Sequence, residues 1–254
     1  MSDGREFRLL IIADIHYGPE PTPGPRPLPQ HKPHLGLALA RRAIADTARQ
    51  GGFDCILLMG DQVDDARGAD TEQRLIEIRD AVAAEAPGVP LLVACGNHDP
   101  APEKVFGIFR THAGPHEVNG YRFVVVVDSY TESGALIRPP DQQQLLRDVA
   151  ARPGGPIIVL QHYPINLLGQ YAPMFMVANY RDVMRDYASC GVLLAIGAHC
   201  HVGQGLNEAD GVMYLTMPCL CVEPFPYAVL TVRGRNVSVE MRHARYPAPP
   251  PAAK

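Results

Sequence analysis

The sequence lacks the features that would assign it to a membrane protein or to a nucleic-acid binder. No apolar run approaches the roughly 20 residues that a helix needs to cross a bilayer. The stretch Met1–Arg8 is polar and charged, so we expect no secretory signal. With 23 basic and 27 acidic side chains, the net charge is -4, which disfavours binding to nucleic acid. We therefore expect neither a membrane nor a nucleic acid as partner.

A disulfide framework is also missing. None of the six cysteines forms a CxxC pair, and most lie within or beside apolar runs. This distribution is typical of buried thiols in a reducing compartment, and it predicts a cytoplasmic location. Cys200 is the exception, because it stands between two histidines and a thiol is a soft metal ligand.

Neither an internal repeat nor a shift in composition marks a domain boundary. We predict a single domain over residues 1–245 and a disordered Pro/Ala-rich tail over residues 246–254, which has nothing to bury. A second proline-rich segment, Pro19–Pro33, is predicted to be an irregular loop, because proline fixes φ and removes a hydrogen-bond donor.

Short apolar runs alternate with amphipathic stretches in the first part of the chain. Strands are predicted at 7–13, 54–59 and 89–94, and helices at 34–49 and 71–84. This alternation is typical of a largely parallel sheet with helical crossovers. Further strands are predicted at 121–127, 156–160, 192–196, 212–216, 227–232 and 236–242, and helices at 141–150 and 179–188. The closely spaced last strands indicate a second, mixed sheet, so the predicted fold class is α/β with two packed sheets flanked by helices.

Five short motifs share one position, the loop that follows a buried apolar run. They are Asp14-Ile15-His16, Gly60-Asp61-Gln62-Val63-Asp64, Gly96-Asn97-His98-Asp99, Gln161-His162-Tyr163-Pro164 and Gly197-Ala198-His199-Cys200-His201. Each motif alone is also explained as a turn, a helix cap or a core histidine. Together they contain five of the ten histidines, and strand ends gather at one edge of a sheet. Carboxylate, imidazole and carboxamide groups suit Mn, Fe, Zn or Co, so the motifs predict a metal site.

This ordered set resembles the calcineurin-like metallophosphoesterase superfamily, whose pattern runs D-x-H, G-D-x-x-D, G-N-H-D/E, a lone H and H-x-H. The resemblance spans Asp14 to His201, about three quarters of the chain. It implies a four-layer α-β-β-α sandwich with two mixed β-sheets, and two divalent metal ions as cofactors. The ligands it implies for the first ion are Asp14, His16, Asp61 and His201, and those for the second are Asp61, Asn97, His162 and His199.

The resemblance also implies catalytic roles for two residues beside the metals. His98 would stabilise the transition state or protonate the leaving alkoxide, and Asp64 would orient and charge His98. Two dications and the carboxylates Asp14 and Asp61 make a positive well suited to a phosphate. A water that bridges two cations loses its proton near neutral pH and becomes a hydroxide nucleophile.

Departures from other branches of the superfamily narrow the expected activity. Asp65 rather than Arg follows Asp64, unlike in serine/threonine protein phosphatases, and purple acid phosphatases need a tyrosine where Asp64 stands. His98 stands where the lipid A pathway pyrophosphatases carry Arg. The pattern is most similar to class III cyclic-nucleotide phosphodiesterases, which implies hydrolysis of phosphodiesters such as 3',5'-cyclic nucleotides. The alternatives are a phosphomonoesterase or nucleotide pyrophosphatase; a non-catalytic scaffold is disfavoured because no ligand is missing.

Two segments are expected to set the choice of a small phosphate-ester substrate, with a nucleotide as first candidate. One is the Pro19–His34 loop, which leaves the end of the first strand, where α/β sites are usually built. The other, Ile165–Ala178, is apolar although it directly follows a predicted ligand. It is interpreted as a lid over a nucleobase, a homodimer interface or core. His31 and His34 belong to no motif, and we expect surface or core roles for them.

Overall fold

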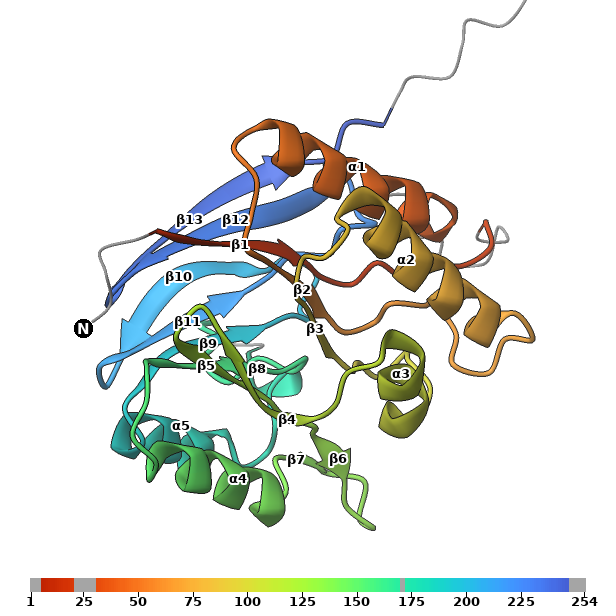
Figure 1. Cartoon of the computed structure of the whole chain (residues 1–254). Helices are drawn as coiled ribbons and strands as arrows, with labels where there is room; N and C mark the ends of the chain where they lie inside the picture. The colour runs from red at the N-terminus through yellow and green to blue at the C-terminus, as the bar shows by residue number, and fades with distance from the viewer. Residues whose placement is uncertain (1–5, 21–30, 170–171, 247–254) are drawn as a thin grey trace, which may run out of the picture.

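Two mixed β-sheets pack face to face and carry helices on their outer sides (Figure 1). The computed structural model describes residues 6–20, 31–169 and 172–246. Its arrangement confirms the predicted α/β class and the four-layer sandwich. Most of the proline-rich loop and the tail from residue 247 onward lie outside the described residues. In the part of the chain that is described, no helix is both long and apolar enough to span a bilayer.

The first sheet has the strand order β13-β12-β1-β2-β3. Strands β1, β2 and β3 are parallel, whereas β12 is antiparallel to both β1 and β13. Their bounds are β1 Phe7–Ile12, β2 Cys55–Met59, β3 Leu91–Ala94, β12 Pro226–Arg233 and β13 Asn236–His243. The parallel order predicted for the first three strands is therefore confirmed.

The second sheet has the strand order β10-β11-β9-β8-β5-β4. Its four central strands are parallel, and β4 and β10 pair antiparallel at the two edges. The bounds are β4 Gly114–Val118, β5 Tyr121–Val125, β8 Ile157–Leu160, β9 Val192–Gly197, β10 Gln204–Ala209 and β11 Val212–Thr216. A small hairpin is formed by β6 Ser129–Tyr130 and β7 Leu136–Ile137. Strands β4 and β10 were not predicted. They lie at the edges of the sheet and are partly exposed, so their sequences lack the continuous apolar run from which the other strands were predicted.

The helices cover the two outer faces of the sandwich. Helices α1, α2 and α3 pack on the first sheet, and α4 and α5 pack on the second. The bounds are α1 Gly36–Arg49, α2 Thr71–Glu85, α3 Pro102–Phe109, α4 Pro140–Ala150 and α5 Tyr180–Ser189, with short 3-10 turns at Pro33–Leu35 and Ala172–Met174. Helix α3 was not predicted from the sequence.

Strand β1 shows why the central strands are apolar throughout. Leu9 and Ile11 point into the core between the sheets, whereas Leu10 and Ile12 point into the core under the helices. Successive side chains of a strand face opposite ways, so a strand covered on both sides must be apolar at every position. Polar residues can then follow only where such a strand ends, and this places the five motifs in the loops.

Candidate metal centre

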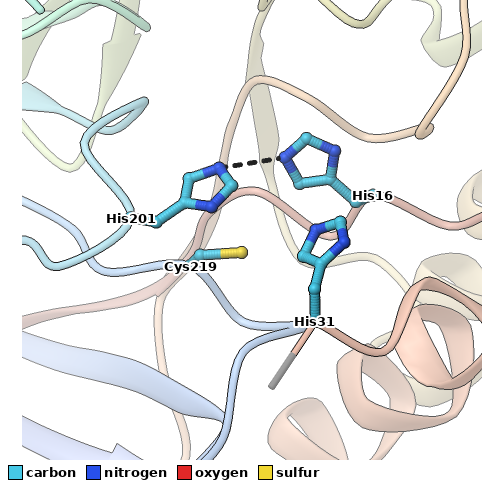
Figure 2. Close-up of side chains that lie close together, drawn as sticks. All are labelled: His16, His31, His201 and Cys219. Atoms are coloured by element: carbon cyan, nitrogen blue, oxygen red, sulfur yellow. Dashed lines mark hydrogen bonds between the residues drawn. The ribbon is translucent and has the colours of Figure 1, made fainter. Parts of the chain in front are cut away.

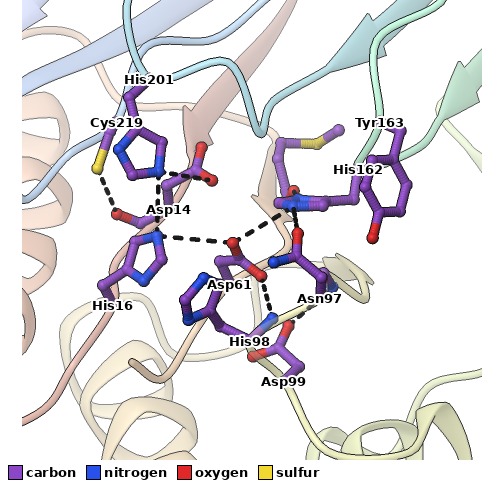
Figure 3. Close-up of polar contacts among 12 residues, drawn as sticks. Asp14, His16, Asp61, Asn97, His98, Asp99, His162, Tyr163, His201 and Cys219 are labelled. Carbon is purple, nitrogen blue, oxygen red and sulfur yellow. Dashed lines mark hydrogen bonds and ion pairs between the residues drawn. The ribbon is translucent and has the colours of Figure 1, made fainter. Parts of the chain in front are cut away.

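The five motifs converge at one edge of the sandwich (Figure 3). The first three follow the parallel strands β1, β2 and β3 of the first sheet, and the last two follow β8 and β9 of the second. The centre therefore takes side chains from both sheets. The structure brings together the seven predicted ligands and the two predicted catalytic residues, namely Asp14, His16, Asp61, Asp64, Asn97, His98, His162, His199 and His201.

A first cluster surrounds the imidazole of His16. Its Nε2 lies 3.2 Å from Nε2 of His201 and 3.5 Å from Oδ2 of Asp61. Nε2 of His201 is 4.0 Å from Oδ1 of Asp14. Two donor atoms bound to one zinc-sized ion at angles between 90° and 109° lie about 2.9–3.4 Å apart. The 3.2 Å separation lies in this range and the 3.5 Å separation just above it, so His16, His201 and Asp61 fit donors that share one cation, whereas Asp14 at 4.0 Å lies farther out.

A second cluster surrounds the imidazole of His162. Its Nε2 lies 3.4 Å from Oδ2 of Asp61 and 3.2 Å from Oδ1 of Asn97. Donor atoms of Asp61, His162 and His199 all lie within 4.8 Å of one another. Because Oδ2 of Asp61 contacts a histidine of each cluster, the geometry fits two cations with Asp61 between them.

Asp14 supplies an independent test of whether a cation fits. Its side chain is completely buried, and neither carboxylate oxygen has a hydrogen-bond partner among the described residues. A buried carboxylate without a partner is costly, because the group loses its hydration and gains nothing in return. A divalent cation would supply the missing partner, so the side chains present fit a metal centre.

The pKa values show how strongly the protein alone perturbs these groups. Burial raises the pKa of Asp14 to about 8. Burial would lower the pKa of His162, but the neighbouring Asp61 and Asp14 carboxylates raise it to about 10. Burial and nearby histidines lower the pKa values of His199 and His201 to about 4, which leaves these rings neutral and able to bind metal.

The backbone of the centre adopts the left-handed region at four non-glycine residues. Asp14, His16, Asp61 and His199 have φ values of 50°, 45°, 50° and 65°. Such conformations cost of order 1–3 kcal/mol each and persist where surrounding contacts impose them. Here the backbone N–H of His16 donates to the carbonyl of Asp61 at 2.8 Å. At Gly96 a Cβ would lie 2.1 Å from Oδ1 of Asp61, so only glycine fits there.

The sequence predicted that the carboxylate of Asp64 orients His98, but the structure shows a different contact. Nδ1 of His98 lies 2.7 Å from the backbone carbonyl oxygen of Asp64, not from its carboxylate. The carboxylate instead lies 3.2 Å from Nδ1 of His16. Asp64 therefore holds His98 through the main chain, and its negative charge supports the imidazole of His16, a predicted metal ligand.

Three residues of the centre had no role in the sequence interpretation. The buried carboxylate of Asp99 accepts hydrogen bonds from the backbone N–H groups of Gln62, Val63 and Gly96, at 2.7, 3.3 and 3.0 Å. Asp99 is the last residue of the third motif, and this position was the one feature of the sequence that could have indicated its role. His31 and Cys219 lie beside His16 and His201, whereas Cys200 joins no candidate metal group among the described residues.

The apolar segment Ile165–Ala178 has a mixed environment. Ile165 and Val177 are buried in the core under α4 and α5, and Met176 is also buried, whereas Leu168 and Met174 are 70% and 76% exposed. The ring of Phe175 lies 6.0 Å from that of His199, at the edge of the centre. The core interpretation therefore holds for part of the segment, and the exposed part keeps the lid and dimer interpretations open.

Comparison with protein families identifies the chain. The family described as calcineurin-like phosphoesterase matches residues 7–203. The chain belongs to the calcineurin-like phosphoesterase family, as its motif pattern predicted. Members of this family use a dinuclear centre of divalent metals, and the His/Asp clusters described above are its candidate ligands. Family membership supports a hydrolase.

Solved structures share the fold. A dimetal phosphatase from Danio rerio has a TM-score of 0.66 and 16% identity, covering 94% of this chain and 99% of its own. GAP50, the anchor in the inner membrane complex of Plasmodium, has a TM-score of 0.58 and 10% identity, covering 94% and 85%. A putative 5'-nucleotidase from Staphylococcus aureus has a TM-score of 0.59 and 13% identity, covering 96% and 55%. A comparison with curated proteins gave no match. At these low sequence identities, the similarity to the solved structures shows a shared fold and does not show a shared function.

Proposed function

We propose that this protein is a dinuclear metal-dependent phosphodiesterase, with nucleotide diesters and first of all 3',5'-cyclic nucleotides as substrates. The observation that carries the proposal is the position of Asp61. Its Oδ2 lies 3.5 Å from the His16 imidazole and 3.4 Å from the His162 imidazole. One carboxylate oxygen thus joins two donor clusters, which is the arrangement that a two-metal hydrolase requires.

The candidate ligands would hold the ions, with Asp14, His16 and His201 on one side of Asp61 and Asn97, His162 and His199 on the other. Two bound dications would supply an activated water and a clamp for the phosphate oxygens. The protein excludes water beneath them, since Asp14, Asp61 and His162 are at most 2% exposed. Asn97 is exposed, so substrate reaches the centre from that side.

His98 is the group that exchanges a proton with the leaving alkoxide. A carbonyl oxygen only accepts, so the contact with the Asp64 carbonyl keeps a proton on Nδ1 of His98. Nε2 is then the ring nitrogen left to face the leaving group. The backbone N–H of His98 donates to Oδ1 of Asp61 at 2.8 Å, which fixes the residue beside the bridging carboxylate.

Activity on paired chromogenic esters tests the diester assignment. The protein, purified with manganese, should hydrolyse bis-p-nitrophenyl phosphate faster than p-nitrophenyl phosphate. The natural diester is then sought in a panel of cyclic nucleotides, glycerophosphodiesters and nucleotide sugars. Faster turnover of the monoester would overturn the diesterase assignment and favour the phosphomonoesterase alternative.

Replacement of Asn97 tests the two-metal mechanism. Asn97→Ala removes a donor from the His162 cluster, so we expect the metal content to fall from two ions per chain toward one. We expect kcat to fall about 100-fold, because the clamp on the phosphate needs both ions. Asn236→Ala, at an exposed position of the edge strand β13, is the control and should retain both ions. Full activity in Asn97→Ala would contradict the mechanism.

A further inference from the structure

One side of the centre carries two donor side chains beyond the seven predicted ligands. His31 and Cys219 stand beside His16 and His201, and the Sγ of Cys219 points toward the space between the three imidazoles (Figure 2). One donor atom from each of the four residues lies within 4.8 Å of the others. The ring centroid of His31 is 5.1 Å from that of His16 and 5.9 Å from that of His201.

The donor atoms of these two residues are shielded from solvent, although His31 as a residue is only half-buried. Nε2 of His31 is shielded from solvent and has no hydrogen-bond partner among the described residues. Cys219 is completely buried, and its Sγ lies 3.2 Å from the backbone carbonyl oxygen of Asp14. The unpartnered carboxylate of Asp14 lies on the same side. A bound ion is one partner that would satisfy such buried polar groups.

The main chain holds both residues in place. His31 pairs with Val222 in a β-bridge, and the N–H of Lys32 donates to the carbonyl of Cys221 at 2.8 Å. The N–H of Cys219 donates to the carbonyl of His201 at 3.1 Å. The segment that carries Cys219 is thus attached to a metal-ligand loop on one side and to the His31 segment on the other, so the four donors form a fixed group.

The two halves of the centre therefore differ in chemistry. The cluster around His162 offers nitrogen and oxygen donors, which accept hard and borderline ions. The cluster around His16 offers three imidazoles and one thiol in addition to the carboxylates of Asp14 and Asp61. A thiolate and imidazoles are the preferred donors of zinc, with Zn–S distances of about 2.3 Å and Zn–N distances of about 2.0–2.1 Å.

We propose that His31 and Cys219 bind the ion held by Asp14, His16 and His201, and that they make this position selective for zinc. The proposal rests on the proposed dinuclear centre and adds a difference between its two positions: zinc in the sulfur-containing position and manganese in the other. The Cys219 thiol loses its proton to solvent as the metal–sulfur bond forms.

The thiolate also bears on substrate choice. Two dications with the carboxylates of Asp14 and Asp61 leave a net charge of +2, and the Cys219 thiolate reduces it to +1. A phosphodiester carries one negative charge, whereas a monoester carries close to two at neutral pH. Removing one positive charge from the centre weakens the attraction for a dianionic monoester about twice as much as for a monoanionic diester, so the extra ligand favours diesters over monoesters.

Cobalt spectroscopy tests the sulfur ligand independently of activity. Loaded with two Co²⁺ ions per chain, the wild-type protein should show a near-ultraviolet sulfur-to-cobalt charge-transfer band. Cys219→Ser should lose the band. Cys221→Ser is the matched control, since its Sγ is equally buried and lies 3.4 Å from that of Cys219. Cys200→Ser is the second control, and both controls should keep the band.

The absence of the band in wild-type protein that holds two cobalt ions would overturn the proposal, and so would its persistence in Cys219→Ser. X-ray absorption of the zinc-loaded wild type provides a check that needs no variant, because one sulfur neighbour at about 2.3 Å is expected. Ester hydrolysis is measured on the same samples. If the protein binds two ions and hydrolyses esters but shows no sulfur ligand, only the inference about Cys219 is contradicted. If the protein shows a sulfur-bound ion but does not hydrolyse esters, the proposed function is contradicted.

Metal competition tests His31. Apoprotein exposed to equal zinc and manganese should bind both, and His31→Gln should lower the zinc-to-manganese ratio about tenfold or more. His34→Gln, three residues away and exposed, should leave the ratio unchanged. An unchanged ratio in His31→Gln would show that His31 is no ligand.

Discussion

At the scale of single residues, Asp64 illustrates how a side chain and its own backbone serve different neighbours. Its carbonyl oxygen holds Nδ1 of His98, and its carboxylate lies 3.2 Å from Nδ1 of His16. A carboxylate this close to the far nitrogen of a metal-binding imidazole makes the ring a stronger ligand through its negative charge. The backbone contact does not depend on the side chain, so a substitution separates the two functions.

The prediction for Asp64→Asn is a loss of metal affinity. We expect the affinity for the ion at His16 to fall about 10–100-fold, because the partner of the His16 ring loses its charge. At saturating metal, kcat should stay within a few-fold of wild type, because His98 keeps its carbonyl partner. Isothermal titration with zinc and kinetics at high metal measure the two quantities. Asp65→Asn, at an adjacent exposed position, is the control. A large loss of kcat with full metal occupancy would contradict this assignment.

At the scale of elements, the centre depends on contacts between strand-end loops. Asp99 joins the loop after β2 to the loop after β3, and its Oδ2 also accepts from Nε2 of Gln62 at 3.2 Å. On the second sheet, buried Arg138 pairs with Asp128 and donates to Oε1 of Gln161 at 3.0 Å, next to the ligand His162. Each sheet thus has a buried polar residue that fixes the start of a ligand loop.

The prediction for Asp99→Ala is a loss of stability. Three backbone N–H groups lose their buried acceptor, and each such loss costs of order 1–3 kcal/mol, partly recovered where water enters. We expect the free energy of unfolding, from urea titration, to fall by about 3 kcal/mol. Asp80→Ala, at an exposed position on α2, should change it by less than about 0.5 kcal/mol. A change as small as the control would show that the loops hold without Asp99.

At the scale of the whole molecule, the centre connects the two sheets. Its ligands follow β1, β2 and β3 in one sheet and β8 and β9 in the other. Ions bound between them stabilise only the folded chain, because the unfolded chain does not bring these ligands together. Metal binding is therefore linked to the stability of the entire sandwich.

Removal of the metals should lower the melting temperature. A ligand present at 1,000 times its Kd stabilises a protein by about 4 kcal/mol, which for a chain of this size corresponds to about 10 °C. Thermal unfolding is compared with and without a chelator, and zinc with manganese should restore the higher value. Asp61→Asn, which lacks the bridging charge, should respond much less to chelator. Equal melting temperatures for the wild type under both conditions would contradict the linkage.

Much of the fold could be predicted because buried strands have a recognisable, continuously apolar sequence. The segments β1, β2 and β3 are apolar throughout, and the helices predicted between them indicated a parallel order. Edge strands β4 and β10 have an exposed face and therefore lack a continuous apolar run. The motif residues were found because each follows a buried run. His31 and Cys219 were not found, because no local pattern shows that segments 188 positions apart lie together.

The sequence alone determined which side chains stand at strand ends, and therefore the kind of centre that they can form. The tertiary structure decided which of these side chains share an ion, that the Asp64 carboxylate supports His16, and that a thiol joins one half of the centre. The physical reason is the distance along the chain over which each effect acts. Alternation and helical periodicity act between neighbours in the chain, whereas coordination depends on distances of a few ångströms across two packed sheets.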